Sequence, residues 1–143
     1  MILVDVNILV YATFTRFEQH AKANKWLDEC LRGTARVGLP WVTLVGFLRI
    51  ATSRRILERP LSMKLAWQQI AEWLDRDAVW TPEPTEQHAN IFGELVALPG
   101  ISGNLVHDAH LAALAIEHGL TLCSTDGDFA RFANLRWLNP LAA

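Results

Sequence analysis

The segment from Gly103 to Phe129 constrains the fold of this 143-residue chain more than any other part of it. Residues 105–118 are predicted to form a helix, with Asn104 as its N-cap, Gly119 just past its end and no proline inside. Apolar side chains cover most of its circumference, which indicates burial on more than one side. Asp108 lies in the first turn of this helix. Because a buried carboxylate without a partner is costly, Asp108 should open onto a cleft or meet a cation.

A short strand and an acidic turn follow this helix. Residues 120–123 are apolar, as expected of a parallel strand buried on both faces, and the STDGD turn at 124–128 comes directly after them. Ligands bind outside the carboxyl ends of the strands in open α/β sheets, so Asp126 and Asp128 are candidate site residues. The alternative is a capping box, in which Thr125 and Asp128 only begin a helix. The turn alone does not decide between the two.

The start of the chain repeats this pattern. Residues 1–4 are apolar, and Asp5 and Asn7 follow before a second apolar run at 8–11. A buried strand that ends in an acid is therefore predicted twice. This repetition favours a functional role for the acids over a capping role.

Composition is typical of one globular domain in a reducing compartment. Hydrophobic residues make up 51% of the chain, which is enough for a sizeable core. No stretch approaches the ~20 apolar residues of a membrane span, and the N-terminus lacks the basic segment of a signal peptide, so we expect a cytoplasmic protein without a membrane partner. Cys30 and Cys123 are far apart in sequence and form no CxxC pair, which favours two free, buried thiols.

The other predicted elements alternate along the chain. They are a helix at 17–31, a strand at 36–39, helices at 40–52 (with Pro40 at the first position) and 63–74 (capped by Ser62), a strand at 78–81, a helix capped by Thr85 and running through 96 to Pro99-Gly100, and an edge strand at 135–138. Alternation of this kind predicts a single domain over residues 1–143 with a three-layer α/β fold around a mainly parallel sheet.

Two surface features leave alternatives open. Arginines at positions 49, 54, 55 and 59 could contact phosphates, or could belong to a solvated basic loop. Tryptophans at 26, 41, 67 and 73 are expected mainly in the core, although exposed ones would suit a binding groove. The formal net charge of -2 means that a nucleic acid would have to meet such a local basic patch.

In the predicted fold, four acids can converge at one end of the sheet. They are Asp5, Asp108, Asp126 and Asp128. Carboxylates about 5 Å apart repel by ~3 kcal/mol per pair at an effective dielectric near ~20, and a divalent cation relieves this repulsion. Ligation by oxygen alone favours Mg or Mn over Zn. Acids that hold such ions are suited to hydrolysing phosphodiesters. No Ser/His/Asp or Cys/His nucleophile arrangement is evident.

Three motifs in this order carry a resemblance to a known family. MILVDVN, LVHDAHLAALAIEHG and STDGDF, followed by a closing strand, resemble the PIN-domain family and specifically the ribonuclease toxins of VapBC-type toxin–antitoxin pairs. The resemblance covers essentially the whole chain. It implies a three-layer α/β/α PIN-like fold, a Mg-dependent (or Mn-dependent) endoribonuclease activity on structured RNA, a cognate antitoxin and a homodimer.

The resemblance also assigns roles by position. Asp5, Asp108 and Asp126 would hold the metal, and Asp128 would complete the catalytic acids. Polar groups that support the site or face the substrate would be Asn7 and Thr125.

The sequence departs from the family pattern at one point. PIN domains commonly carry a Glu in the helix after strand two, and Gly46 stands at the equivalent position here. Thr43, one turn earlier, is a weak candidate to supply a hydroxyl instead. We therefore expect at most a weak or substrate-assembled second metal.

Three rival readings differ in class. Gly46 motivates a catalytically weak or silent PIN-like binding module. An HD-type phosphohydrolase would bind metal through His88, His107, Asp108 and Asp126, but that family is all-helical and strands are predicted here. His107 and His110 are instead expected to be packing or surface residues. A haloacid-dehalogenase-type enzyme would use Asp5 as its nucleophile, but its second acid is replaced by Asn7.

Overall fold

Five short parallel strands form the sheet, in the order β3-β2-β1-β4-β5. The computed structural model describes residues 1–142. Its elements, in chain order, are β1 (Ile2–Val4), α1 (Val6–Thr13), α2 (His20–Arg32), β2 (Val37–Gly38), α3 (Trp41–Ala51), α4 (Met63–Leu74), β3 (Val79–Trp80), α5 (His88–Val96), α6 (Asn104–His118), β4 (Thr121–Cys123), the 3-10 helix η1 (Gly127–Arg131) and β5 (Trp137–Leu138).

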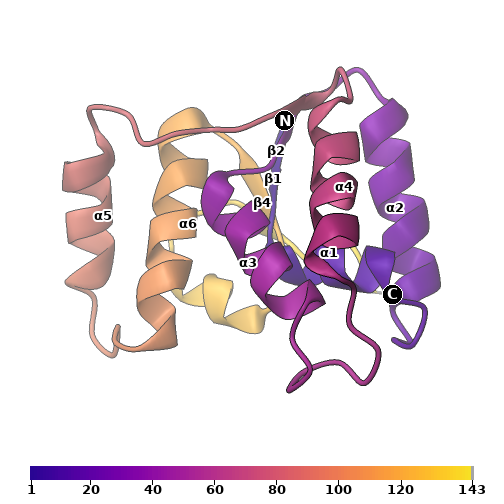
Figure 1. Ribbon diagram of the computed structural model, residues 1–143. Helices are drawn as coiled ribbons and strands as arrows, with labels where there is room; N and C mark the ends of the chain where they lie inside the picture. Colours follow the sequence, from indigo (N-terminus) through magenta and orange to yellow (C-terminus); the bar gives the residue numbers. More distant parts are fainter. Residues whose placement is uncertain (143) are drawn as a thin grey trace.

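Helices cover both faces of the sheet, so the predicted three-layer α/β/α fold is confirmed. Figure 1 shows α5 and α6 on one side of the strands and α1, α2 and α4 on the other. Side chains on a strand alternate between faces, and β1 accordingly divides its residues between two cores. Val4 packs with the core of α1 to α4, and Leu3 packs with the core of α6, β4 and η1.

Helix α6 is the central helix of its layer because its side chains are small. Its alanines at 109, 112, 113 and 115 are all fully buried, which lets the helix lie close to the sheet. Gly119 ends the helix in the left-handed conformation with φ of 66°, as predicted. At the other end the prediction is wrong by one residue, because Gly103 is the N-cap and Asn104 is the first helical residue.

Other helix starts differ modestly from the sequence prediction. The apolar run at 8–11 belongs to α1, whose N-cap is Asp5. Helix α2 begins at His20, three residues later than expected. The Thr85 hydroxyl accepts a hydrogen bond from the Gln87 amide in the turn before α5, so it caps that turn and not the helix. Ser62 caps α4 as predicted, by accepting from the Leu65 amide.

The tryptophans divide between core and surface. Trp73 is buried and packs edge-on against Phe47, and Trp26 is half-buried. The core interpretation is wrong for Trp41 and Trp67, which are 45% and 47% exposed. Both cysteines are free thiols, and Cys30 is only half-buried. Among residues 1–142 there is no helix with the length and apolarity needed to cross a bilayer.

Candidate active site

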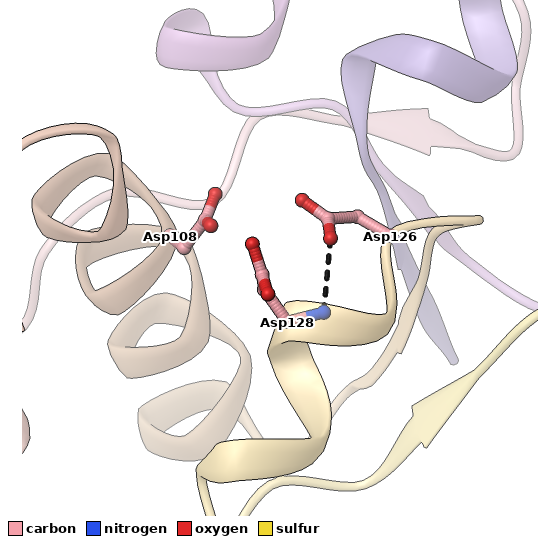
Figure 2. Close-up of side chains that lie close together, drawn as sticks. All are labelled: Asp108, Asp126 and Asp128. Atoms are coloured by element: carbon pink, nitrogen blue, oxygen red, sulfur yellow. Dashed lines mark hydrogen bonds between the residues drawn. The ribbon is translucent and has the colours of Figure 1, made fainter. Parts of the chain in front are cut away.

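Three acids form a compact group beside the carboxyl ends of the strands. One carboxylate oxygen from each of Asp108, Asp126 and Asp128 lies within 4.8 Å of the other two. Figure 2 shows the three side chains pointing toward a common space, with Asp108 reaching across from α6. Helix α6 and the segment that follows β4 thus bring together residues that the sequence separates.

The segment after β4 holds its two acids by a local cap. Asp126 is the N-cap of η1, and its Oδ1 accepts a hydrogen bond from the Asp128 amide at 2.9 Å (Figure 2). Asp128 lies in the first turn of η1 and is exposed. Its nearest cation is Arg131, whose guanidinium lies 3.5 Å away with both side chains about half exposed. Such an exposed pair is largely screened by water, so it neutralises the acids only in part.

Asp5 lies near this group but outside it. The parallel register pairs Val4 with Cys123, and the Asp5 amide donates to the Cys123 carbonyl, so the residue after β1 lies beside the residue after β4. Both carboxylate oxygens of Asp5 are engaged, one by the Val6 amide at 2.8 Å and the other by the Ser124 hydroxyl at 2.7 Å. Of the three predicted metal ligands, Asp108 and Asp126 are in the compact group, where Asp128 takes the third place.

Ser124, which was not among the predicted site residues, connects three of them: Asp5, Asn7 and Asp126. Its fully buried hydroxyl donates to Asp5 and accepts from the Asn7 side-chain amide at 3.1 Å and from the Asp126 amide at 3.0 Å. Asn7 also accepts from the Thr125 amide at 3.5 Å. The sequence feature that could have identified Ser124 is its place directly after a buried strand, which a parallel sheet sets beside Asp5. Ser124 therefore holds the Asp5 carboxylate and the backbone of Asp126 at once.

Burial and neighbouring acids raise the affinity of Asp108 and Asp5 for protons. Burial, followed by the charges of Asp126, Asp5 and Asp128, raises the pKa of Asp108 to about 6, and the Arg131 charge opposes this shift. The pKa of Asp5 is also raised, chiefly by burial, although the hydrogen bonds from Ser124 and Val6 favour its ionised form. Four carboxylates that repel one another at neutral pH leave the site in need of a cation.

A cleft with a volume of about 500 Å³ opens beside these acids. Its lining consists of Asp5, Val6, Trp41, Val42, Thr43, Val45, Gly46, Arg49, Asn104, His107, Asp108 and Leu111. Gly46 faces the cleft, and a side chain there would meet Val6 Cγ2 at an ordinary 3.5 Å. The Thr43 hydroxyl donates to the Val4 carbonyl at 3.2 Å, so it secures α3 to β1 and does not face a ligand.

The histidines divide between the cleft and a separate network. His107 is exposed and lines the cleft, whereas His110 is half-buried. His88 contacts Glu117 at 2.7 Å and His110 at 3.2 Å, in a network between α5 and α6. This network and the parallel sheet do not fit an HD-type phosphohydrolase.

Comparisons with known proteins agree with this geometry. The family model described as PIN domain matches residues 2–135. "Ribonuclease VapC37" of Mycobacterium tuberculosis is 44% identical over 142 residues, which is 99% of each chain. "Ribonuclease VapC33" of the same species is 41% identical over 141 residues, again 99% of each chain.

Solved structures resemble the fold. VapBC-1 from nontypeable Haemophilus influenzae has a TM-score of 0.70 at 20% identity, covering 99% of this chain and 100% of that one. VapC20 of Mycobacterium tuberculosis, a Sarcin-Ricin loop cleaving toxin, has a TM-score of 0.68 at 19% identity, covering 95% and 99%. By the family model and its full-length relatives, this chain belongs to the PIN-domain family, among the VapC ribonucleases.

Proposed function

We propose that this VapC-type ribonuclease hydrolyses RNA phosphodiesters at the four acids around the cleft, with a bound divalent cation. The observation that carries the proposal is the group formed by Asp108, Asp126 and Asp128, whose ligand oxygens lie within 4.8 Å of one another. Relatives aligned over the whole chain are named ribonucleases, so the chemistry expected of the acids agrees with the family.

The donor set fits a hard divalent cation. The three acids offer only oxygen atoms, and burial together with the neighbouring acids raises the pKa of Asp108 to about 6. We propose Mg or Mn, held by Asp108 and Asp126 with Asp5 and Asp128 acting directly or through water. When bound there, the ion would supply a water of lowered pKa and positive charge beside the phosphate.

The surrounding residues hold the acids in place. The Ser124 hydroxyl and the Val6 amide fix the Asp5 carboxylate, and η1 fixes Asp126 through the Asp128 amide. Asn7 is proposed to keep the Ser124 hydroxyl directed at Asp5, because its own amide donates to that oxygen. Thr125 would face the substrate from the same turn.

The proposed partner is a cognate antitoxin. Solved neighbours include VapBC2 of Rickettsia felis bound to a promoter DNA fragment, with a TM-score of 0.68 at 21% identity, which supports the same kind of toxin–antitoxin assembly for this chain. We further propose a homodimer that acts in the cytoplasm.

A cleavage assay tests the proposed activity. Purified protein is incubated with total RNA, with and without Mg or Mn, and cleavage should require the ion. Asp5→Asn and Asp108→Asn should lose cleavage while remaining folded, and Asp75→Asn, at the exposed end of α4, is the matched control that should cleave normally. Equal cleavage by both site variants would mean that a contaminating nuclease is responsible.

Calorimetry separates this proposal from the catalytically silent alternative. Gly46 in the cleft wall is the observation that favours a silent module. Titration of the protein with Mg or Mn should give a binding signal that is lost in Asp108→Asn. Absence of ion binding in the unaltered protein would favour a module without catalysis.

A further inference from the structure

One stripe of helix α3 faces the cleft and leaves an aromatic ring unburied. Trp41, Val45 and Arg49 are spaced four residues apart, so they lie on the same face of the helix, and all three line the cleft. Trp41 is 45% exposed and Val45 is 58% exposed. A large apolar surface beside the site proposed to hydrolyse a phosphodiester suits a ligand that also has an apolar face.

Trp41 also separates the cleft from a second hollow. This hollow has a volume of about 300 Å³. Its lining consists of Pro40, Trp41, Val42, Pro82, Glu83, Pro84, His110 and Leu114. Because Trp41 and Val42 line both hollows, a chain that leaves the acids on this side passes the indole ring first.

The second hollow suits an uncharged ring. Its walls are mostly proline, leucine and tryptophan, and its polar groups are His110 and Glu83. The His110 ring is half-buried, and its Nδ1 lies 3.2 Å from His88 Nε2. The exposed Glu83 carboxylate would repel a phosphate. A nucleobase satisfies both conditions, since it is flat, uncharged and able to accept or donate hydrogen bonds.

Arg49 supplies the charge for a backbone. Within residues 1–142 no carboxylate lies within 4.0 Å of its guanidinium, since the ion pairs there involve Arg32, His88 and Arg131. The side chain is exposed and lines the same cleft as Asp108. An unpaired guanidinium next to a stacking surface is the combination found in sites for single-stranded nucleic acid.

We propose that an unpaired base of the RNA stacks on Trp41, that its neighbour enters the hollow beside His110, and that Arg49 contacts a phosphate in the cleft. This inference rests on the proposed function and assigns the side chains that hold unpaired nucleotides beside the acids. A duplex does not fit, because its bases already stack on one another and cannot turn out onto a side chain.

Binding measured without cleavage tests the stacking role. In the full-length Asp108→Asn protein, fluorescence anisotropy follows an unstructured, end-labelled oligoribonucleotide of mixed sequence and the same strand paired with its complement. Trp41→Ala should weaken single-strand binding about tenfold to a hundredfold, and Trp41→Phe should retain most of it. Trp67→Ala is the matched control, because that ring is 47% exposed on α4 and lies outside both hollows. The duplex should bind weakly to all four proteins.

The salt dependence of RNA binding distinguishes stacking on Trp41 from the phosphate contact of Arg49. Arg49→Ala should lower the slope of log affinity against log salt by about 0.7, the value of one phosphate contact on a single strand. Trp41→Ala should leave that slope unchanged, because stacking releases no counterions. Arg76→Ala, at an exposed residue just past the C-cap of α4, is the control for loss of a remote positive charge.

Several outcomes would overturn the inference. Unchanged single-strand binding by a folded Trp41→Ala protein would do so, as would duplex binding as tight as single-strand binding. Sedimentation that shows Trp41→Ala to weaken self-association, with RNA binding intact, would assign the ring to a contact between copies. If the unaltered protein fails to cleave RNA with Mg, the proposed function fails separately, since the binding assay does not require cleavage.

Discussion

Helix α6 carries two carboxylates whose surroundings are opposite. Glu117 has a fully buried side chain, and its two oxygens accept from the Thr85 amide at 2.6 Å and contact His88 at 2.7 Å. Asp108 lies more than two turns closer to the N-terminus of the same helix, and it faces Asp126 and Asp128. One acid has its partners within the fold, and the other has further acids for neighbours.

The difference separates a structural charge from a functional one. A buried carboxylate that accepts from a backbone amide and a histidine is stabilised by the protein alone, and it joins α5 to α6. Carboxylates that repel one another are stabilised only when something positive arrives. Asp108 therefore lowers the stability of the metal-free protein to serve a ligand, whereas Glu117 supports the fold.

The largest expected effect is the loss of cleavage in Asp108→Asn. Removal of one charged oxygen ligand should lower the rate about a hundredfold to a thousandfold, the range seen when one charge-stabilising group is deleted from an active site. Glu117→Gln should cleave within about twofold of the unaltered protein, because its network lies apart from the acids. The rate is measured on the RNA that the unaltered protein cleaves. A similar loss in both variants would erase the contrast.

Glu117→Ala should instead lower stability. The substitution leaves the Thr85 amide and the His88 ring without their acceptor, which should cost roughly 2–3 kcal/mol and lower the melting temperature by roughly 5–12 °C. Thermal unfolding followed by circular dichroism measures the change. Glu94→Ala, an exposed acid on α5, serves as the control and should melt within about 2 °C of the parent. A Glu117→Ala protein as stable as its parent would show that the network contributes nothing.

The free energy of unfolding should depend on pH through Asp108. The folded-state pKa of Asp108 is raised to about 6 from an ordinary value of 3.8, so the folded protein holds this proton more tightly than the unfolded chain does. The stabilisation that this bound proton gives the folded state is fully present below pH ~4 and is lost as the pH rises through ~6. Urea unfolding in EDTA should show the parent losing about 1–2 kcal/mol relative to Asp108→Asn over this window. A constant difference between the two proteins would contradict the raised pKa of Asp108.

Local sequence signals were sufficient for most of the fold. The glycine that ends α6, the serine that caps α4 and the buried apolar strands each act through nearby backbone, so their elements were predicted within a few residues. The convergence of the acids followed from one further step, because parallel strands end at the same edge. Predictions failed where the outcome depends on tertiary contacts, as with the exposed rings of Trp41 and Trp67.

The detail of the site was beyond the sequence for the same reason. Whether Asp5 or Asp128 joins the compact group depends on which carboxylate oxygens already accept hydrogen bonds. Asp5 accepts one from the Ser124 hydroxyl, which lies next to it because β1 pairs with β4. The link from His88 to Glu117 likewise depends on how α5 packs against α6. A contact between polar residues of two elements does not change the hydrophobic periodicity of either element, so the sequence pattern does not reveal it.

The smallest expected effect comes from adding an acid where the family pattern has one. Gly46→Glu places a carboxylate on the cleft wall without strain, because a Cβ there meets Val6 Cγ2 at 3.5 Å. The helix gains up to about 1 kcal/mol in propensity, which repulsion from Asp108 should offset until an ion binds. Gly93→Glu on α5 is the matched control, since a Cβ at Gly93 meets nothing within 4 Å and the site is remote from the cleft. In EDTA, Gly93→Glu should therefore be the more stable variant by about 0.5–1 kcal/mol. Mg should stabilise the parent protein by binding to it, and only Gly46→Glu should gain more stability from Mg than the parent does. Equal behaviour of the two variants under both conditions would mean that position 46 does not interact with the bound ion.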